Sequence, residues 1–156
     1  MITVRLQISG GEIKDTAQEY GLVYLESDSI LASPIKDFEK TTYAETEGSN
    51  IDPNTVDAEF DYKVKFFVKA DGNLGNANAV IAKFNKELYE EDADHIKTFK
   101  QVAFYNDYKK VKIVGYPSPI EQATDFWRDR LGRQADVVCV EWNIKVNKPS
   151  LCDFNL

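Results

Sequence analysis

The sequence predicts a mainly β protein of the α+β class, an antiparallel β-sandwich or barrel flanked by one amphipathic α-helix. Residues 56–68 alternate apolar and polar side chains, which is the pattern of a half-buried strand. Other alternating segments occur near both ends of the chain, whereas a 3.6-residue period begins only near residue 76. Because this pattern is typical of one packed β domain, we expect residues 1–156 to form a single domain.

The segment 56–68 is unusually long for a strand. Its even positions are all apolar, so we expect one buried face and one face exposed to water or to a partner. From Val56 to Lys69 the strand would be roughly 43 Å long, comparable with the ~40 Å diameter of a compact domain of this size. Such strands are common in proteins whose sheets continue into neighbouring subunits. The charged residues of its other face are Asp57, Glu59, Asp61, Lys63, Lys65 and Lys69.

Three earlier segments have the composition of strands. Residues 2–8 alternate until two glycines end the run, residues 20–25 are largely apolar, and residues 38–45 follow a proline. Residues 47–55 are rich in Gly, Asn, Asp and Pro, so we expect a turn or an exposed loop there.

The predicted helix begins near Asn76, and Asn73 or Asn76 is available as its N-cap. We expect it to end in the acidic run of residues 90–94. Its apolar stripe should pack on the sheet. The stripe consists of Ala77, Val80, Ile81, Phe84 and Leu88.

The second half of the chain returns to strands. Residues 98–105 and 110–116 form a predicted hairpin, and residues 138–146 alternate as a last strand. Residues 120–134 mix helical and strand signals, and we interpret them as a long loop or a short helix. Residues 147–156 follow as a predicted C-terminal arm.

Composition and charge exclude several classes of function. The net charge of −7 disfavours binding to nucleic acid or to anionic membranes, because such binding needs clustered Lys and Arg. No apolar run is long enough to cross a bilayer, and the first residues lack the pattern of a signal peptide. Cys139 and Cys152 have no disulfide or metal-binding spacing, so we expect an intracellular protein with two free thiols.

No catalytic motif can be identified. His95 is the only histidine and lacks the context of a nucleophile motif. The acidic run 90–94 lacks the spacing of a calcium loop, and the glycines of residues 71–76 match no phosphate-binding motif. Nothing selects a glycosidase pair among the 26 acidic residues. We therefore expect no catalytic residue, no cofactor and no metal ligand, and we predict that the protein is not an enzyme.

Two groups of residues are candidates for a subunit interface. Trp127, Arg128 and Arg130 belong to residue types enriched at interface hot spots, although such a loop serves equally well to plug a barrel end. The second group is the charged face of residues 57–69, which is acidic in its first half and basic in its second. That gradient suits a contact repeated around a ring, and equally a solvated surface.

The order of these elements resembles a known family, the ring-forming domain of siphophage distal tail proteins. The resemblance covers about residues 20–146 and implies a β-sandwich or barrel with one flanking helix, closely similar to tail-tube proteins and to the tube protein of type VI secretion. The matching features are Gly21, Leu22 and Leu25, the E-x-E-G-x-x-x-D segment from Glu45 to Asp52, the long strand, the N-x-x-I-A-x-F-N pattern from Asn78 to Asn85, and the hairpin that ends in Gly115, Tyr116 and Pro117.

The resemblance implies a hexameric ring, other phage tail proteins as partners, and a lumen for DNA whose acidic lining would repel phosphate. It also implies assembly in the host cytoplasm and a final place in the virion tail. The strand at residues 2–8 is additional, and no carbohydrate-binding domain follows, so we expect a plain ring or tube component of a phage or prophage tail. The alternatives are a small-ligand-binding β-barrel, if the interior is hollow, and a hydrolase with paired carboxylates.

Overall fold

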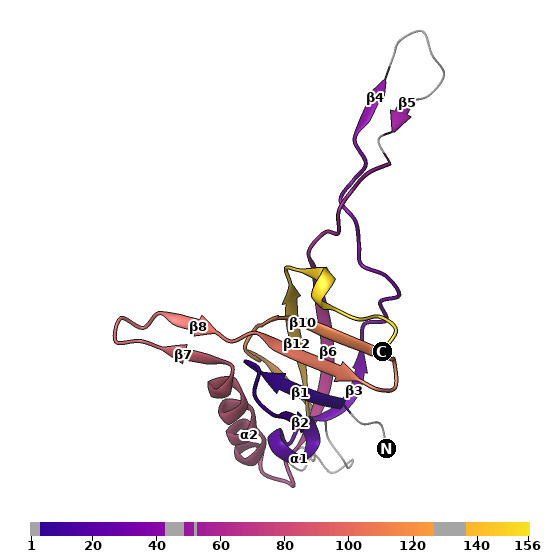
Figure 1. Cartoon of the computed structure of the whole chain (residues 1–156). Helices are drawn as coiled ribbons and strands as arrows, with labels where there is room; N and C mark the ends of the chain where they lie inside the picture. Colours follow the sequence, from indigo (N-terminus) through magenta and orange to yellow (C-terminus); the bar gives the residue numbers. More distant parts are fainter. Residues whose placement is uncertain (1–3, 43–48, 52, 127–136) are drawn as a thin grey trace.

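The computed structural model of the chain describes residues 4–42, 49–51, 53–126 and 137–156. Within these residues the protein is mainly antiparallel β-sheet with one long helix (Figure 1). The fold class predicted from the sequence is therefore confirmed. Two β layers enclose the core, and two narrow ribbons extend from the body in different directions.

The first layer, here called sheet A, has the strand order β2-β1-β9-β10. Its strands are β2 (Ile13–Asp15), β1 (Val4–Ile8), β9 (Val102–Asn106) and β10 (Val111–Pro117). All neighbours are antiparallel, and β9 and β10 form the predicted hairpin. The register aligns Leu6, Phe104 and Ile113 in one cross-strand row, and none of these three side chains is exposed to solvent.

The second layer, sheet B, is centred on β12 (Val137–Val146), which pairs along its whole length with β6 (Phe60–Lys69). Strand β3 (Val23–Ser27) lies on the other side of β6, and β11 (Ala123–Phe126) pairs with the first part of β12. The predicted last strand at residues 138–146 is thus confirmed. Residues 123–126, which we expected in a loop or short helix, instead form β11, because β12 offers them a free edge.

Strand β10 joins the two sheets. Its last residues leave sheet A and pair with the end of β12, where Tyr116 lies opposite Lys145 and Pro117 opposite Ile144. Gly115 sits at this crossing, and a Cβ atom there would overlap the backbone carbonyl of Lys145. Only glycine lets the two backbones approach so closely.

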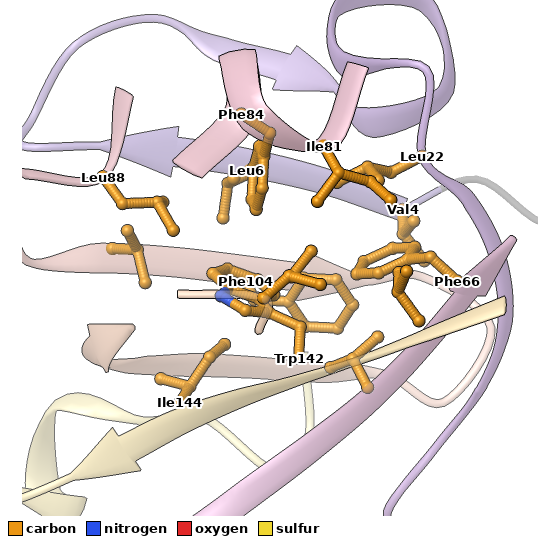
Figure 2. Close-up of a cluster of buried hydrophobic side chains, with 14 of the residues drawn as sticks. Val4, Leu6, Leu22, Phe66, Ile81, Phe84, Leu88, Phe104, Trp142 and Ile144 are labelled. Atoms are coloured by element: carbon orange, nitrogen blue, oxygen red, sulfur yellow. The ribbon is translucent and has the colours of Figure 1, made fainter. Parts of the chain in front are cut away.

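Aromatic side chains fill the space between the sheets (Figure 2). Phe66 lies 6.4 Å from Phe104 and 6.2 Å from Trp142, measured between ring centroids. Tyr62 lies 6.1 Å from Phe104, so rings from both sheets interdigitate. All four side chains are completely buried. Offset and edge-on ring contacts of this kind add to the stabilisation that burial itself provides.

Helix α2 (Leu74–Glu87) begins where the change of period predicts it. Asn73 is its N-cap, and the side-chain oxygen of Asn73 accepts a hydrogen bond of 3.0 Å from the amide of Gly75. The stripe packs on the body as expected, since Ala77, Ile81 and Phe84 are buried. A second, short helix, α1 (Thr16–Tyr20), was not predicted; it is capped by the carboxylate of Asp15, while Gly21 ends it at φ 69°. Tyr20 belongs to this helix, so the strand predicted at residues 20–25 begins only at Val23.

The strand predicted at residues 56–68 is shorter than expected, because β6 begins at Phe60. Val146, the last residue of β12, pairs with Phe60, so the sheet offers no partner to earlier residues on that side. The amide of Lys36 instead donates to the carbonyl of Val56, and the amide of Ala58 donates to Pro34. Val56 is consequently 61% exposed, and its expected burial is wrong. Ala58 and Phe60 are only partly buried, whereas the even positions from Tyr62 to Val68 are buried as predicted.

The acidic run and the next predicted strand also differ from expectation. The helix stops before the acidic run, and Tyr89–Glu91 form β7, which pairs with β8 (Lys97–Phe99) in a separate hairpin. The strand predicted at residues 98–105 is therefore split between β8 and β9. The two halves have different partner strands, since β8 pairs with β7 and β9 pairs with β10.

The expected strand at residues 38–45 is represented by β4 (Lys40–Thr42), and the expected loop at residues 47–55 contains β5 (Ser49–Ile51). These two strands pair with each other at the end of the longer ribbon (Figure 1). The last residues of the chain lie along β10, where Lys112 and Asp153 exchange backbone hydrogen bonds of 2.7 and 2.9 Å. A 3₁₀ turn at Pro149–Leu151 directs the chain to this position.

Candidate functional site

The longer ribbon, here called the arm, comprises residues 30–59 and connects β3 to β6. It leaves the body beside β3, extends to the β4–β5 pair and returns to the start of β6 (Figure 1). Backbone hydrogen bonds of 2.9 Å from Lys36 to Val56 and of 2.8 Å from Ala58 to Pro34 hold its two limbs together. The hydroxyl of Thr55 adds a bond of 2.7 Å to the carbonyl of Lys36. The base of the arm is therefore an antiparallel ribbon, with an isolated bridge between Ile35 and Asp57.

Large apolar side chains are exposed along the described part of the arm. Leu31 is 92% exposed, and Ile35, Phe38 and Val56 are also exposed. A two-stranded ribbon by itself is marginally stable in water, and apolar side chains that are grouped on a surface mark interaction sites. The sequence did not reveal these four residues as one exposed group. Val56, in particular, continues the alternation of the strand that follows it and was therefore expected to be buried.

The sequence of the arm is strongly acidic. Residues 30–59 contain two lysines and seven acidic residues, a net charge of −5, which is most of the −7 of the whole chain. Asp57 and Glu59, predicted as the acidic half of a charged strand face, are in fact exposed residues of the arm. The graded surface predicted from the sequence is thus divided between the arm and β6.

The basic half of that surface, together with Asp61 of the acidic half, lies on the outer face of sheet B. Asp61, Lys63, Lys65 and Lys69 are exposed on β6, as the alternation predicts. Acidic residues from the neighbouring strands lie beside two of these lysines: Lys65 Nζ is 2.9 Å from a carboxylate oxygen of Glu26 on β3, and Lys63 Nζ is 3.9 Å from one of Glu141 on β12. The outer face of sheet B therefore carries both positive and negative charges.

The Lys65–Glu26 contact shifts both titrations. Its hydrogen bond and the charge of Lys65 lower the pKa of Glu26, and the same contact raises the pKa of Lys65. Since both side chains are exposed, such a pair contributes little to stability. The outer face is better suited to giving a partner direction and register than to tight binding.

The second candidate group, Trp127, Arg128 and Arg130, lies outside the described residues. Strand β11 ends at Phe126, directly before this group. Within the part of the chain that the structure describes, sheet B has edges at β11 and at β3, on opposite sides of the β12–β6 pair. Leu25, at a bulge in β3, is exposed there.

The titratable groups considered for chemistry are separated in the structure. His95 is at the turn of the β7–β8 hairpin with Nδ1 3.3 Å from a carboxylate oxygen of Glu91, and both are exposed or partly exposed. Cys139 on β12 and Cys152, which follows the 3₁₀ turn, are free thiols, and burial raises the pKa of each. In the described ranges, no group of three His, Cys, Asp or Glu side chains has the arrangement of a metal site. Nor does a helix in those ranges have the length and apolar run that would cross a membrane.

Comparisons with known proteins find a structural neighbour but no sequence relative. No family model matches the sequence, and no curated protein matches it. Among solved structures, the fold is similar to the crystal structure of the Dit protein of phage SPP1, described as a paradigm of the hub adsorption apparatus in phages that infect Gram-positive hosts. The TM-score is 0.57 at 18% sequence identity, over 94% of this chain. The chain spans about half the length of that protein, covering 50% of it. The likeness is one of fold.

Proposed function

We propose that this protein is a noncatalytic structural subunit of a phage or prophage tail, and that its subunits join into a ring through the arm. The observation that carries this proposal is the arm itself, a ribbon that extends from the body with Leu31, Ile35, Phe38 and Val56 exposed. When such an arm packs on a second subunit, its apolar side chains are removed from water, which favours association.

Ring closure requires a heterologous contact, in which one surface of a subunit meets a different surface of the next. The arm provides one such surface, since it leaves the body at the β3 side of sheet B. The opposite edge of that sheet, at β11, is a suitable counterpart because its outer backbone groups have no neighbouring strand in the described chain. The fold similarity to a phage tail hub protein supports a place in the virion tail, with other tail proteins as partners.

The interior of the domain does not favour the small-ligand alternative. Tyr62, Phe66, Phe104 and Trp142 occupy the space between the sheets, where a ligand-binding barrel has its cavity. We therefore propose that the function lies on the outside of the domain.

The proposal is tested by shortening the arm. Lys36 and Val56 face each other across the ribbon, so residues 37–55 can be replaced by Asn-Gly, which favours a tight two-residue turn. Concentrated wild-type protein at low salt should form a species several times the 17.7 kDa subunit mass in light scattering. The shortened protein should stay monomeric, with the circular dichroism and melting temperature of a folded domain.

A matched pair of point variants separates the arm from general surface apolarity. Val56 on the arm is 61% exposed and Ile96 on the β7–β8 hairpin is 60% exposed. Val56→Asp should reduce assembly, whereas Ile96→Asp should leave it unchanged. Wild-type protein that remains monomeric at every concentration and salt, or equal assembly of both variants, would overturn assembly through the arm.

A further inference from the structure

The arm leaves the body at residues 27–29, where side chains from three other parts of the fold meet. The hydroxyl oxygen of Ser27 lies 2.9 Å from the hydroxyl of Tyr24 and 2.9 Å from that of Tyr62. The side-chain amide of Asn106, from the end of β9, donates to the same oxygen at 3.4 Å. Tyr62 and Asn106 are completely buried. This one serine therefore connects β3, β6 and β9.

The hydrogen-bonding capacity of Ser27 is fully used. A serine hydroxyl has one hydrogen to donate and two lone pairs to accept with. Tyr62 and Asn106 supply donors, which leaves the Ser27 hydrogen for the oxygen of Tyr24. Burial of its side chain raises the pKa of Tyr62 to about 12, so this hydroxyl keeps its proton under physiological conditions. Removing the Ser27 hydroxyl would leave buried polar groups without their partner, which is costly.

The next two residues are held as well. The amide of Asp28 donates to the carbonyl of Lys63 at 3.0 Å, and its carboxylate accepts from the amide of Lys63 at 3.0 Å. The ammonium group of Lys109 donates to the carbonyl of Ser27 and, at 2.9 Å, to the hydroxyl of Ser29. Three consecutive residues are thus tied to β6 and to the β9–β10 turn.

Asn106 links this cluster to the turn that carries Lys109. Its side-chain oxygen accepts from the amides of Tyr108 and Lys109, each at 3.0 Å, while its amide group reaches Ser27. The position of the lysine and the position of the serine are therefore set by the same buried side chain. A flexible connection would need none of these contacts.

We propose that residues 27–29 form a fixed joint that sets the direction of the arm relative to the body, with Ser27 as its positioning residue. A pre-oriented arm loses less conformational freedom when it binds, which favours association. That consequence for assembly rests on the proposed function. The joint itself is a property of the single subunit and can be tested without any oligomer.

The test measures the distance between spin labels on the arm and on the body in dilute monomer. Cysteines introduced at the exposed positions Asp37 and Lys83, after Cys139→Ser and Cys152→Ser, carry the labels. The starting protein should give one narrow distance distribution, and Ser27→Ala should broaden it at least twofold. The matched control is Ser33→Ala, within the arm, which should leave the width unchanged. Ser27→Thr, which retains the hydroxyl, should restore a narrow distribution.

A second variant guards against simple unfolding. Lys109→Ala removes the two bonds to Ser27 and Ser29 without altering the buried Tyr62 and Asn106, and it should broaden the distribution while the melting temperature changes little. Equal widths in the starting protein, Ser27→Ala and Lys109→Ala would overturn the joint. Because the measurement uses monomer, its failure is distinguishable from a failure of ring assembly.

Discussion

The ring of Phe84 on α2 meets the indole of Trp142 on β12 edge-on, with centroids 5.4 Å apart and planes inclined by 77°. The ring of Phe84 also contacts that of Tyr20 of α1, with centroids 5.3 Å apart. The indole NH of Trp142 donates to the carbonyl of Ser118 at 2.9 Å, so the large ring is buried without an unsatisfied donor. This contact attaches the helix to sheet B and makes the apolar stripe part of the core.

Phe84→Ala should lower the free energy of unfolding by about 3 to 5 kcal/mol, because it empties a buried aromatic site. Phe84→Asp should unfold the subunit, since it places a charge against Trp142. Urea denaturation followed by circular dichroism measures both. Lys83→Ala, on the exposed face of the same helix turn, is the control and should stay within ~0.5 kcal/mol of wild type. A folded monomer that carries Phe84→Asp would mean that the stripe is an interface.

The start of β6 can be tested with two residues of the same predicted alternation. Phe66→Ala should cost about 3 to 5 kcal/mol, because Phe66 is completely buried. Val56→Ala should cost less than ~0.5 kcal/mol, because that side chain is on the arm and largely exposed. Thermal denaturation of the two variants distinguishes a strand that begins at Phe60 from one that begins at Val56. A similar loss of stability in both variants would mean that the strand begins at Val56, as the alternation predicts.

Gly115→Ala should be destabilising by about 1 to 3 kcal/mol. In an ordinary strand the same change is neutral or favourable, since glycine has the greater freedom in the unfolded chain. Here the added Cβ would meet the carbonyl of Lys145 and a methyl carbon of Ile144 at 3.0 Å, both in the neighbouring strand. Denaturant titration gives the sign of the effect. A stabilised variant would show that β10 does not cross onto β12 at this point.

The Glu26–Lys65 pair predicts a pH dependence. Lys65 lowers the pKa of Glu26 below its ordinary 4.5. The contribution of Glu26 to the stability of the fold is therefore present above pH 4.5 and is lost as the pH falls through the lowered pKa. The pKa of Lys65 is raised above its ordinary 10.5. Its contribution to stability is therefore complete below pH 10.5 and is lost as the pH rises through the raised pKa. Side-chain NMR titration of Glu26 should give a pKa nearer 4.5 in Lys65→Ala. Lys63→Ala, whose lysine pairs with Glu141, should leave the Glu26 titration unchanged.

Local sequence pattern was sufficient to predict elements that bury one face along their whole length. The alternation of Val138 to Val146 and the stripe from Ala77 to Phe84 identified β12 and α2, and Asn73 was one of two candidate caps. Each follows from contacts within a few residues or from one buried face. The same reasoning placed Lys63 and Lys65 on an exposed face, but not the acids Glu26 and Glu141 that lie beside them. Those come from strands distant in sequence.

The class of fold, the long helix, the central strands and their buried faces all follow from local sequence pattern, because side-chain periodicity reflects which face is buried. The ends of the strands and the choice of partner strand depend on how distant segments pack. Val56 continues the alternation of β6, yet it pairs with Lys36 in the arm, because β12 extends no further than Val146. Ser27 is an ordinary residue in the sequence and becomes the base of the arm only when Tyr62 and Asn106 are brought to it. Such contacts depend on the packing of distant segments, which local periodicity does not encode.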